Sequence, residues 1–340
     1  MKRDAFFDNA KFILIFLVVF GHMIQPFTQD SAIMRVSYDF IYLFHMPAFI
    51  LLSGFFAKGI GNAGYIWNLT KKLVFPYIIF QGVYSAYYYL IGNASWQTPI
   101  FQPHWSLWFL LSLFSWHLLL IVFKKMPPLA GIISAVGIGI IVGYINGIGA
   151  EYSLSRTFVF FPFFLMGYWI TKDQIKNLTH PIVKHVSFAI MSIVVILLVY
   201  LPSFSSHWLL GSFAFADLDQ PIWGGFIRLG IYLIATILIC SLFAWIPRKQ
   251  YRWTNLGQQT LYVYLLHGLF IQFFREAGWF RVDHILDVFG LAILSLLIVL
   301  LLSSKTVFIS FQPIIEGRLT QIKLRIMERK NRKDKQVNYQ

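Results

Sequence analysis

Residues 8–23 read DNAKFILIFLVVFGHM, an apolar stretch with a lysine near its start and a histidine near its end. Lys11 and His22 lie eleven residues apart. A helix turns about 100° and rises about 1.5 Å per residue, so both groups fall on nearly one face, about 16 Å apart along the axis. A charged side chain in a bilayer costs on the order of 2.5 kcal/mol or more, so such groups are kept where they meet a partner, water or a ligand. This pair predicts a functional site within the membrane.

The composition indicates a polytopic membrane protein. Hydrophobic residues make up 58% of the chain, charged residues only 12%, and the mean hydropathy is +0.66. These values differ strongly from those of a soluble globular domain. The 340 residues have room for about ten spans of about 20 residues each. We therefore expect an all-α fold with about ten transmembrane helices and no large soluble domain.

The positions of the basic residues predict the orientation. The ten apolar runs cover residues 8–24, 37–57, 73–92, 105–123, 129–146, 157–171, 184–201, 223–246, 258–274 and 286–311. With the N-terminus in the cytoplasm, the inner connections and the tail hold twenty-one Lys and Arg residues and the outer connections hold four. The positive-inside rule therefore places both termini in the cytoplasm. The predicted units are a membrane domain, 1–311, and a basic cytoplasmic tail, 312–340.

The basic tail and the single cysteine indicate which partners to expect. The segment from Arg318 to Lys335 is strongly basic, and we expect it to lie on anionic membrane lipid rather than to bind nucleic acid. The chain has one cysteine and no metal-type Cys/His spacing, so no metal is predicted. The sequence leaves the oligomeric state open.

Polar residues in the first two spans suggest chemistry. Asp8 precedes Lys11 by three residues, a spacing at which helical side chains meet, so it either supports Lys11 or merely neutralises it at the cytoplasmic edge. In the second span, residues 44–56 read FHMPAFILLSGFF. Pro47 bends a helix, and the pair Ser53-Gly54 permits close helix packing, whereas an apolar helix does not need His45. Two intramembrane histidines favour proton transfer or hydrogen bonding to a substrate.

Six sequence blocks together resemble the acyltransferase-3 membrane family. The Lys11 to His22 spacing fits its signature of a basic residue, a ten-residue gap and a histidine, and residues 44–56 resemble its second-helix block. Further matches follow in order as TKKLVFPYIIF (70–80), WSLWFLLSLF (105–114), RTFVFFPFFLMGYWI (156–170) and LGQQTLYVYLLHGLF (256–270). Each block is weak alone, but their order and spacing are specific.

Within that family the chain is most similar to the branch called fucose 4-O-acetylase-like. This resemblance implies an O-acetyltransferase of a bacterial cell membrane that moves acetyl from cytoplasmic acetyl-CoA to a sugar hydroxyl of a surface or exported glycan, or of a lipid-linked sugar. Two positions depart from the family pattern. Leu69 and Lys72 stand where two arginines are common, and Ser106 stands where a histidine is common, with His104 two residues earlier.

The residues and the resemblance together assign roles on the donor side. Lys11, helped by Lys71 and Lys72, is expected to hold the phosphates of CoA, because lysine is a point charge for phosphate. His22 is the predicted general base for the acceptor hydroxyl, or carries the acyl group itself in a stepwise reaction. His45 either orients and polarises the thioester or has a structural role.

On the outer side, Arg156 is the main candidate for acceptor binding, with Glu151 and Ser153 beside it. Arg156 opens a span on the side where positive charge is scarce. His267 matches a family block and is expected to support the site, although a lone histidine late in an apolar helix is more often a helix–helix hydrogen bond.

Two other classes of function compete with an enzyme. A proton-coupled transporter or flippase for a lipid-linked sugar would use the same histidines and lysine, but such proteins usually show repeated halves and interrupted spans. The sequence shows neither feature. A scaffold without chemistry would leave Lys11, His22 and His45 unexplained.

Overall fold

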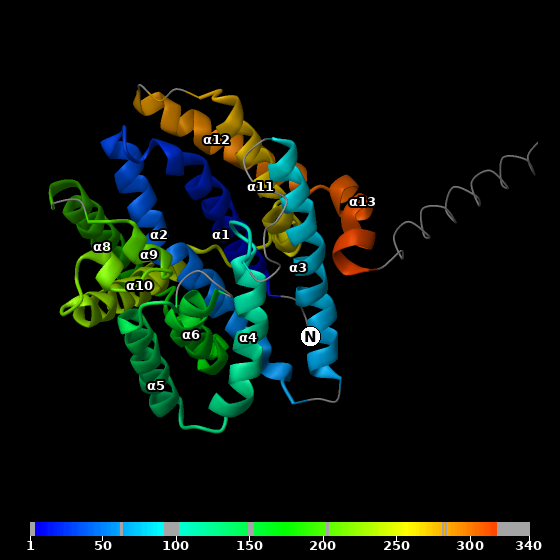
Figure 1. Ribbon diagram of the computed structural model, residues 1–340. Helices are drawn as coiled ribbons and strands as arrows, with labels where there is room; N and C mark the ends of the chain where they lie inside the picture. The colour runs from blue at the N-terminus through cyan, green and yellow to red at the C-terminus, as the bar shows by residue number, and fades with distance from the viewer. Residues whose placement is uncertain are drawn as a thin grey trace, which may run out of the picture.

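The computed structural model describes residues 4–61, 64–91, 102–148, 153–201, 204–280, 282 and 284–317. Within these ranges the secondary structure is helical, without a strand (Figure 1). The longer helices are α1 (Ala5–Ile24), α2 (Ala32–Phe55), α3 (Tyr65–Leu90), α4 (Trp108–Phe123), α5 (Pro128–Ile141), α6 (Leu154–Trp169), α8 (Pro181–Tyr200), α10 (Gly224–Trp245), α11 (Thr260–Ala277), α12 (Ile285–Leu302) and α13 (Lys305–Glu316). Short elements that matter below are η1 (Gln25–Phe27), α9 (His207–Leu210) and η6 (Thr254–Gln258).

The predicted all-α architecture is confirmed. Five helices are long and apolar enough to cross a membrane by length and composition: the α1–η1 unit, the α2 unit, α8, α10 and α12. The last predicted run, 286–311, is two helices, because Ser304 accepts a hydrogen bond from the Val307 N–H and starts α13. The number ten and the cytoplasmic termini stay predictions. The predicted boundary at residue 311 falls inside α13, and the tail from 318 lies outside the described residues.

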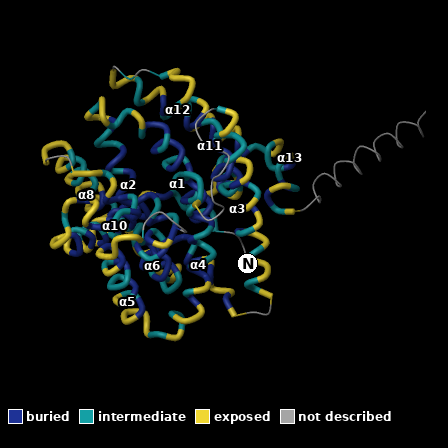
Figure 2. Tube along the Cα trace, in the orientation of Figure 1, coloured by how far each residue is buried: buried dark blue, intermediate teal, exposed yellow. Residues whose placement is uncertain are grey.

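The outer surface of the bundle is apolar, unlike that of a soluble protein. Figure 2 shows the buried chain concentrated in α1, α2 and α6, with exposed positions on α5, α8 and α12. Large apolar side chains on those outer helices are well exposed, including Phe188 on α8 and Leu286 and Phe289 on α12. Exposed apolar surface on this scale suits contact with lipid. The protein is therefore an integral membrane protein.

Two glycines let α2 and α6 approach closely. A Cβ at Gly54 of α2 would collide with the carbonyl oxygen of Phe164, and one at Gly167 of α6 would collide with that of Leu51. The predicted packing role of Gly54 is thus seen in the structure. The hydroxyl of Ser53 bonds within its own helix, donating to the Phe49 carbonyl at 2.9 Å. This helix pair forms an aromatic wall of the cavity at His22, and it contributes no acidic side chain to the described lining of that cavity.

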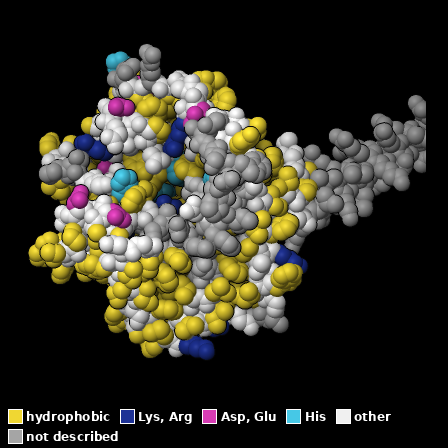
Figure 3. All heavy atoms as spheres, in the orientation of Figure 1, with side chains coloured by type: hydrophobic (Ala, Val, Ile, Leu, Met, Phe, Trp, Pro, Cys, Tyr) yellow, Lys and Arg dark blue, Asp and Glu magenta, His cyan; other side chains and the backbone are white. Residues whose placement is uncertain are grey.

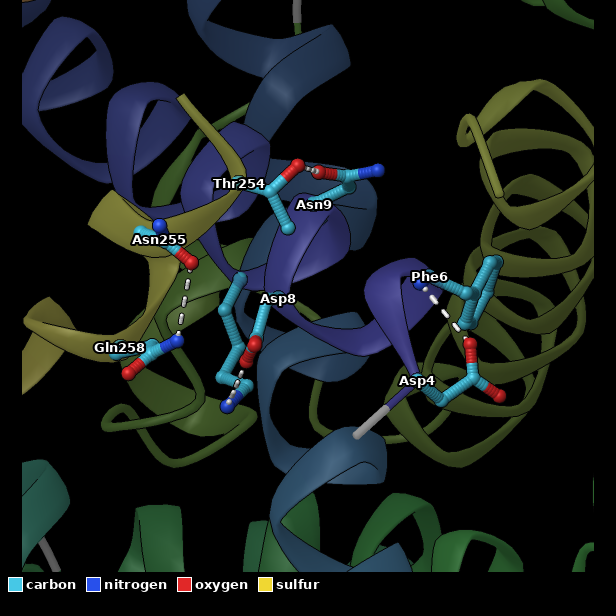
Figure 4. A network of polar contacts seen from close by, with 8 residues as sticks. Asp4, Phe6, Asp8, Asn9, Thr254, Asn255 and Gln258 are labelled. Carbon is cyan, nitrogen blue, oxygen red and sulfur yellow. Dashed lines mark hydrogen bonds and ion pairs between the residues drawn. The ribbon is translucent and has the colours of Figure 1, made fainter. Parts of the chain in front are cut away.

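A polar anchor fixes the start of α1. The Asn9 amide donates to the carbonyls of Pro247, at 2.8 Å, and Lys249, at 3.0 Å, and its oxygen accepts from Thr254 Oγ1 at 2.7 Å. Figure 4 shows Asn9 and Thr254 pointing toward one another, with Asp8 one position earlier on α1. Because Asn9 is fully buried, these three bonds set the rotation of α1 and thereby the face on which Lys11 and His22 lie.

Candidate active site

His22 lies in the last full turn of α1, surrounded by groups from three other segments. Its Nδ1 is 3.1 Å from the hydroxyl of Tyr42 on α2. The Trp105 ring, from the connection before α4, packs against it with centroids 4.3 Å apart, and the ring of His267 on α11 lies at 5.7 Å. The histidine that the sequence singled out is therefore enclosed by aromatic rings rather than directed at lipid.

His45 and His267 hold their rings in the same way. Nδ1 of each contacts the carbonyl four residues earlier in its own helix: that of Ile41 at 2.9 Å and that of Val263 at 3.0 Å. A carbonyl only accepts, so Nδ1 carries the proton and Nε2 of the neutral ring keeps its lone pair. Nε2 of His267 is buried and has no hydrogen-bond partner among the described residues.

A small cavity of about 110 Å³ lies between His22 and His45. His22, His45, Tyr42, Trp105, Arg156 and Tyr264 are among its lining residues. Figure 3 shows a hollow in the middle of the visible face, with histidine and basic side chains inside it. Three of the predicted residues, His22, His45 and Arg156, thus meet at one cavity although they come from three helices.

Arg156 is held firmly at the cavity wall. Its guanidinium donates to the Leu210 carbonyl and to Ser212 Oγ, both at 3.3 Å, and it lies 5.1 Å from the centroid of the Trp108 ring. No described carboxylate lies within ion-pair distance of it. The cavity therefore keeps a positive charge that no acid of the described chain neutralises.

A wider polar pocket lies next to the cavity. It has a volume of about 510 Å³ and is lined by Arg35, Ser205, Ser206 and His207 among others. Gln25 and Leu210 line both spaces. This pocket lies at the end of α1 opposite Lys11 and provides room for a polar substrate beside His22.

The donor-side residues are only partly brought together. Lys11 forms an ion pair with Asp8 at 3.1 Å and lies 5.2 Å from the Phe56 ring centroid. Lys58, which the sequence analysis did not select, lies over the adjacent Phe55 ring at 4.4 Å. Lys71 and Lys72 are exposed on α3, and no described contact joins either to Lys11.

Two further residues that the sequence analysis considered, Ser153 and His104, do not line the cavity. Ser153 is buried at the start of α6 with φ of 55°, and it does not line the cavity. Glu151 lies outside the described residues. His104 contacts Ser85 Oγ through Nε2 at 2.9 Å, on α3 rather than at His22.

The sequence analysis missed Tyr42, Trp105 and Arg275. Trp105 has a φ of 39°, a strained left-handed backbone of the kind that gathers at functional sites. Gly268, directly after His267, leaves room for the Trp105 ring. Arg275 on α11 donates to the His22 carbonyl at 2.7 Å and to Gln25 Oε1 at 2.9 Å. In the sequence, Arg275 was marked only by its position in one of the outer connections, which together hold four basic residues.

The site defines a membrane enzyme built around an enclosed histidine, and comparison with known proteins gives the family. The model of the acyltransferase domain family (acyltransferase-3) matches residues 4–304. The chain therefore belongs to the acyltransferase-3 family and is a membrane acyltransferase, as the resemblance implied.

Two curated relatives are distant. The chain is 25% identical over 208 residues to the nodulation protein NolL of Sinorhizobium fredii, covering 56% of this chain and 55% of that protein. It is 32% identical over 100 residues to NolL of Mesorhizobium japonicum, covering 22% of this chain and 27% of that protein. The chain thus spans about half or less of the length of these relatives. No solved structure matches it.

Proposed function

We propose that this acyltransferase moves an acetyl group from cytoplasmic acetyl-CoA to a sugar hydroxyl of an exported or cell-surface glycan. The observation that carries the proposal is the cavity in which His22, His45 and Arg156 meet, beside a polar pocket large enough for a sugar. The resemblance to the fucose 4-O-acetylase-like branch supports acetyl as the group and a sugar as the acceptor.

His22 serves as the general base. In the tautomer whose Nδ1–H donates to the Tyr42 hydroxyl, Nε2 keeps the lone pair that accepts a proton from the acceptor hydroxyl. The hydroxyl oxygen then attacks the thioester carbonyl, the bond from that carbon to sulfur breaks, and the imidazolium returns the proton to the departing CoA thiolate. The same geometry also suits a stepwise route, in which Nε2 attacks the thioester carbonyl and expels the CoA thiolate. The acceptor hydroxyl then attacks the acetyl group on the ring, frees Nε2 and passes its proton to the thiolate.

Lys11 is the donor anchor in this proposal. The α1 helix is continuous from Ala5 to Ile24, so a lysine at one end and the base at the other are separated by about 16 Å along its axis. An extended acyl-pantetheine arm can run along that distance, with the CoA phosphates at Lys11 and the thioester at His22. Lys58 stands over the ring next to that of Lys11 and adds a second positive charge there.

The first test is transfer of radiolabelled acetyl from acetyl-CoA to native glycan in membranes carrying the wild type, His22→Ala or Lys11→Ala at matched protein levels. His185→Ala is the control, because His185 is exposed on α8 and does not line the cavity. Loss of label in His22→Ala, by about 10² to 10⁴-fold, with an unchanged control, supports the general-base role. Undiminished transfer in His22→Ala overturns it.

A second test separates donor binding from chemistry. Acetyl-pantetheine carries the thioester but lacks the nucleotide phosphates of acetyl-CoA. Lys11→Gln should raise KM for acetyl-CoA severalfold and leave KM for acetyl-pantetheine unchanged. An equal rise for both donors would show that Lys11 does not act through the phosphates. Lys72→Gln changes a predicted donor-side lysine on the exposed face of α3. The KM of this variant for acetyl-CoA measures how much Lys72 contributes to donor binding.

A further inference from the structure

An apolar pocket adjoins the catalytic cavity on the side of α11. It has a volume of about 320 Å³ and lies between the end of α1 with η1 and the last turns of α11. Met23, Phe27, Ile271, Phe274 and Phe280 supply its apolar lining. The exposed ring of Phe273 lies near the end of α11, and the exposed ring of Trp279 follows directly after that helix. Aromatic residues of this kind gather at the membrane–water boundary. The proposed acetyl transfer to a polar sugar leaves this pocket unused.

A cation lies in the wall of this apolar pocket. Arg275 lines it, and its guanidinium donates to the His22 carbonyl and to Gln25 Oε1 while lying 5.5 Å from the Trp105 ring centroid. Its Nε is buried and has no hydrogen-bond partner in the described part of the chain, and no described carboxylate lies within ion-pair distance. A half-buried arginine without an acid favours an anionic ligand, and a guanidinium is suited to phosphate.

The three spaces meet at one residue. Gln25 lines the catalytic cavity, the polar pocket and the apolar pocket, and Arg275 holds the Gln25 side chain. A ligand that fits these spaces has an apolar chain in the apolar pocket, an anionic group at Arg275 and a polar head in the polar pocket. Such a ligand is an amphiphile whose anionic linkage joins the apolar chain to a sugar. A soluble polysaccharide explains the polar pocket but neither the apolar one nor Arg275.

We propose that the acceptor is a sugar linked through phosphate to a long apolar lipid, with the lipid chain in the apolar pocket, the phosphate at Arg275 and the sugar hydroxyl at His22. This inference rests on the proposed function, because it names the acceptor class for the same site. It accounts for the adjacency of an apolar and a polar pocket at the end of α1.

Photocrosslinking tests the lipid site without any catalytic step. The probe is a polyprenyl phosphate with a photoreactive group in its chain, added without acetyl-CoA to the purified full-length protein in detergent, followed by mass spectrometry of the labelled peptides. We expect labels in residues 23–27 and 271–280, and a loss of at least fivefold in Arg275→Gln with recovery in Arg275→Lys. Phe289→Ala, on the exposed face of α12, should label like the wild type.

Competition distinguishes the possible occupants. An unlabelled sugar-bearing polyprenyl phosphate should suppress the labels, whereas phosphatidylglycerol at the same concentration should not. Equal suppression by phosphatidylglycerol would overturn the proposal in favour of an ordinary phospholipid, and labels spread over α8 and α12 would overturn a defined pocket. Because the readout is binding, specific labels in a preparation that transfers no acetyl would refute the proposed function and leave the lipid site standing.

Discussion

At the scale of single residues, the site depends on how His22 is held. Its ring is touched by a hydroxyl, an indole and a second imidazole from three different segments, and its backbone carbonyl accepts from Arg275. Such enclosure fixes the ring before any substrate arrives, and pre-organised groups do not have to reorient during reaction. Under the proposed function, the nearby partners of His22 therefore position its ring for proton transfer.

Tyr42→Phe should slow transfer by about ten- to a hundred-fold, because it removes the hydroxyl at His22 Nδ1 while the ring contacts remain. A hydrogen bond to a group that becomes charged contributes about 1.5–3 kcal/mol, which corresponds to that range. Kinetics in membranes should show the loss in kcat with KM for acetyl-CoA unchanged. Tyr200→Phe, on the exposed end of α8, is the matched control. A pure change in KM would argue against a role for Tyr42 in holding the base.

Asp8→Asn should strengthen donor binding. Asp8 is paired with Lys11 at 3.1 Å, so loss of its charge releases Lys11 for the CoA phosphates. The expected result is a lower KM for acetyl-CoA, by about two- to fivefold, since a partly exposed ion pair is worth about 1 kcal/mol or less. A KM that rises instead would mean that Asp8 positions Lys11 for the donor. Direct donor titration of the two proteins measures this.

At the scale of elements, the close contact between α2 and α6 brings Tyr42 and His45 toward Arg156. Gly54 and Gly167 meet the backbone of the opposite helix, and the central aromatic residues of α6 fill the space beside them. The two helices therefore act as one rigid wall of the cavity. Sequence suggested this for Ser53-Gly54 because small residues permit close packing, but it did not identify α6 as the partner helix.

Gly54→Ala should destabilise the protein by about 1–3 kcal/mol, the usual cost of overpacking a filled interior. The added Cβ has no space, because it meets the carbonyl of Phe164 and neither backbone can yield without moving its helix. Gly137→Ala on α5 is the control, since a Cβ there meets nothing within 4 Å. Thermal unfolding in detergent should show a lower midpoint for Gly54→Ala and an unchanged or higher one for Gly137→Ala. Equal midpoints would contradict the close packing of α2 and α6.

At the scale of the whole molecule, orientation decides which pocket meets which substrate. The positive-inside rule predicts that Lys11 lies near the cytoplasm and the polar pocket near the outer surface. Under the proposed function, a cytoplasmic donor and a glycan acceptor would then approach from opposite sides, and neither would have to cross the membrane.

Cysteine labelling on intact cells tests this orientation. In a Cys240→Ser background, Ser205→Cys should react with a membrane-impermeant maleimide, and Lys125→Cys should react only after the cells are opened. Both positions are exposed in the structure, so access to solvent does not limit either reaction. Labelling of Lys125→Cys on intact cells would reverse the predicted topology.

The sequence by itself determined the membrane class, the helical fold and the likeness to the acyltransferase-3 family. Composition and helical periodicity are local properties, and the Lys11 to His22 spacing follows from one helix. Only the tertiary structure decided which residues surround His22, because Tyr42, Trp105, Arg156 and His267 approach it through packing between distant segments. It also left Lys71 and Lys72 on an outer face, since a favourable place in sequence does not fix where the helix carrying it packs.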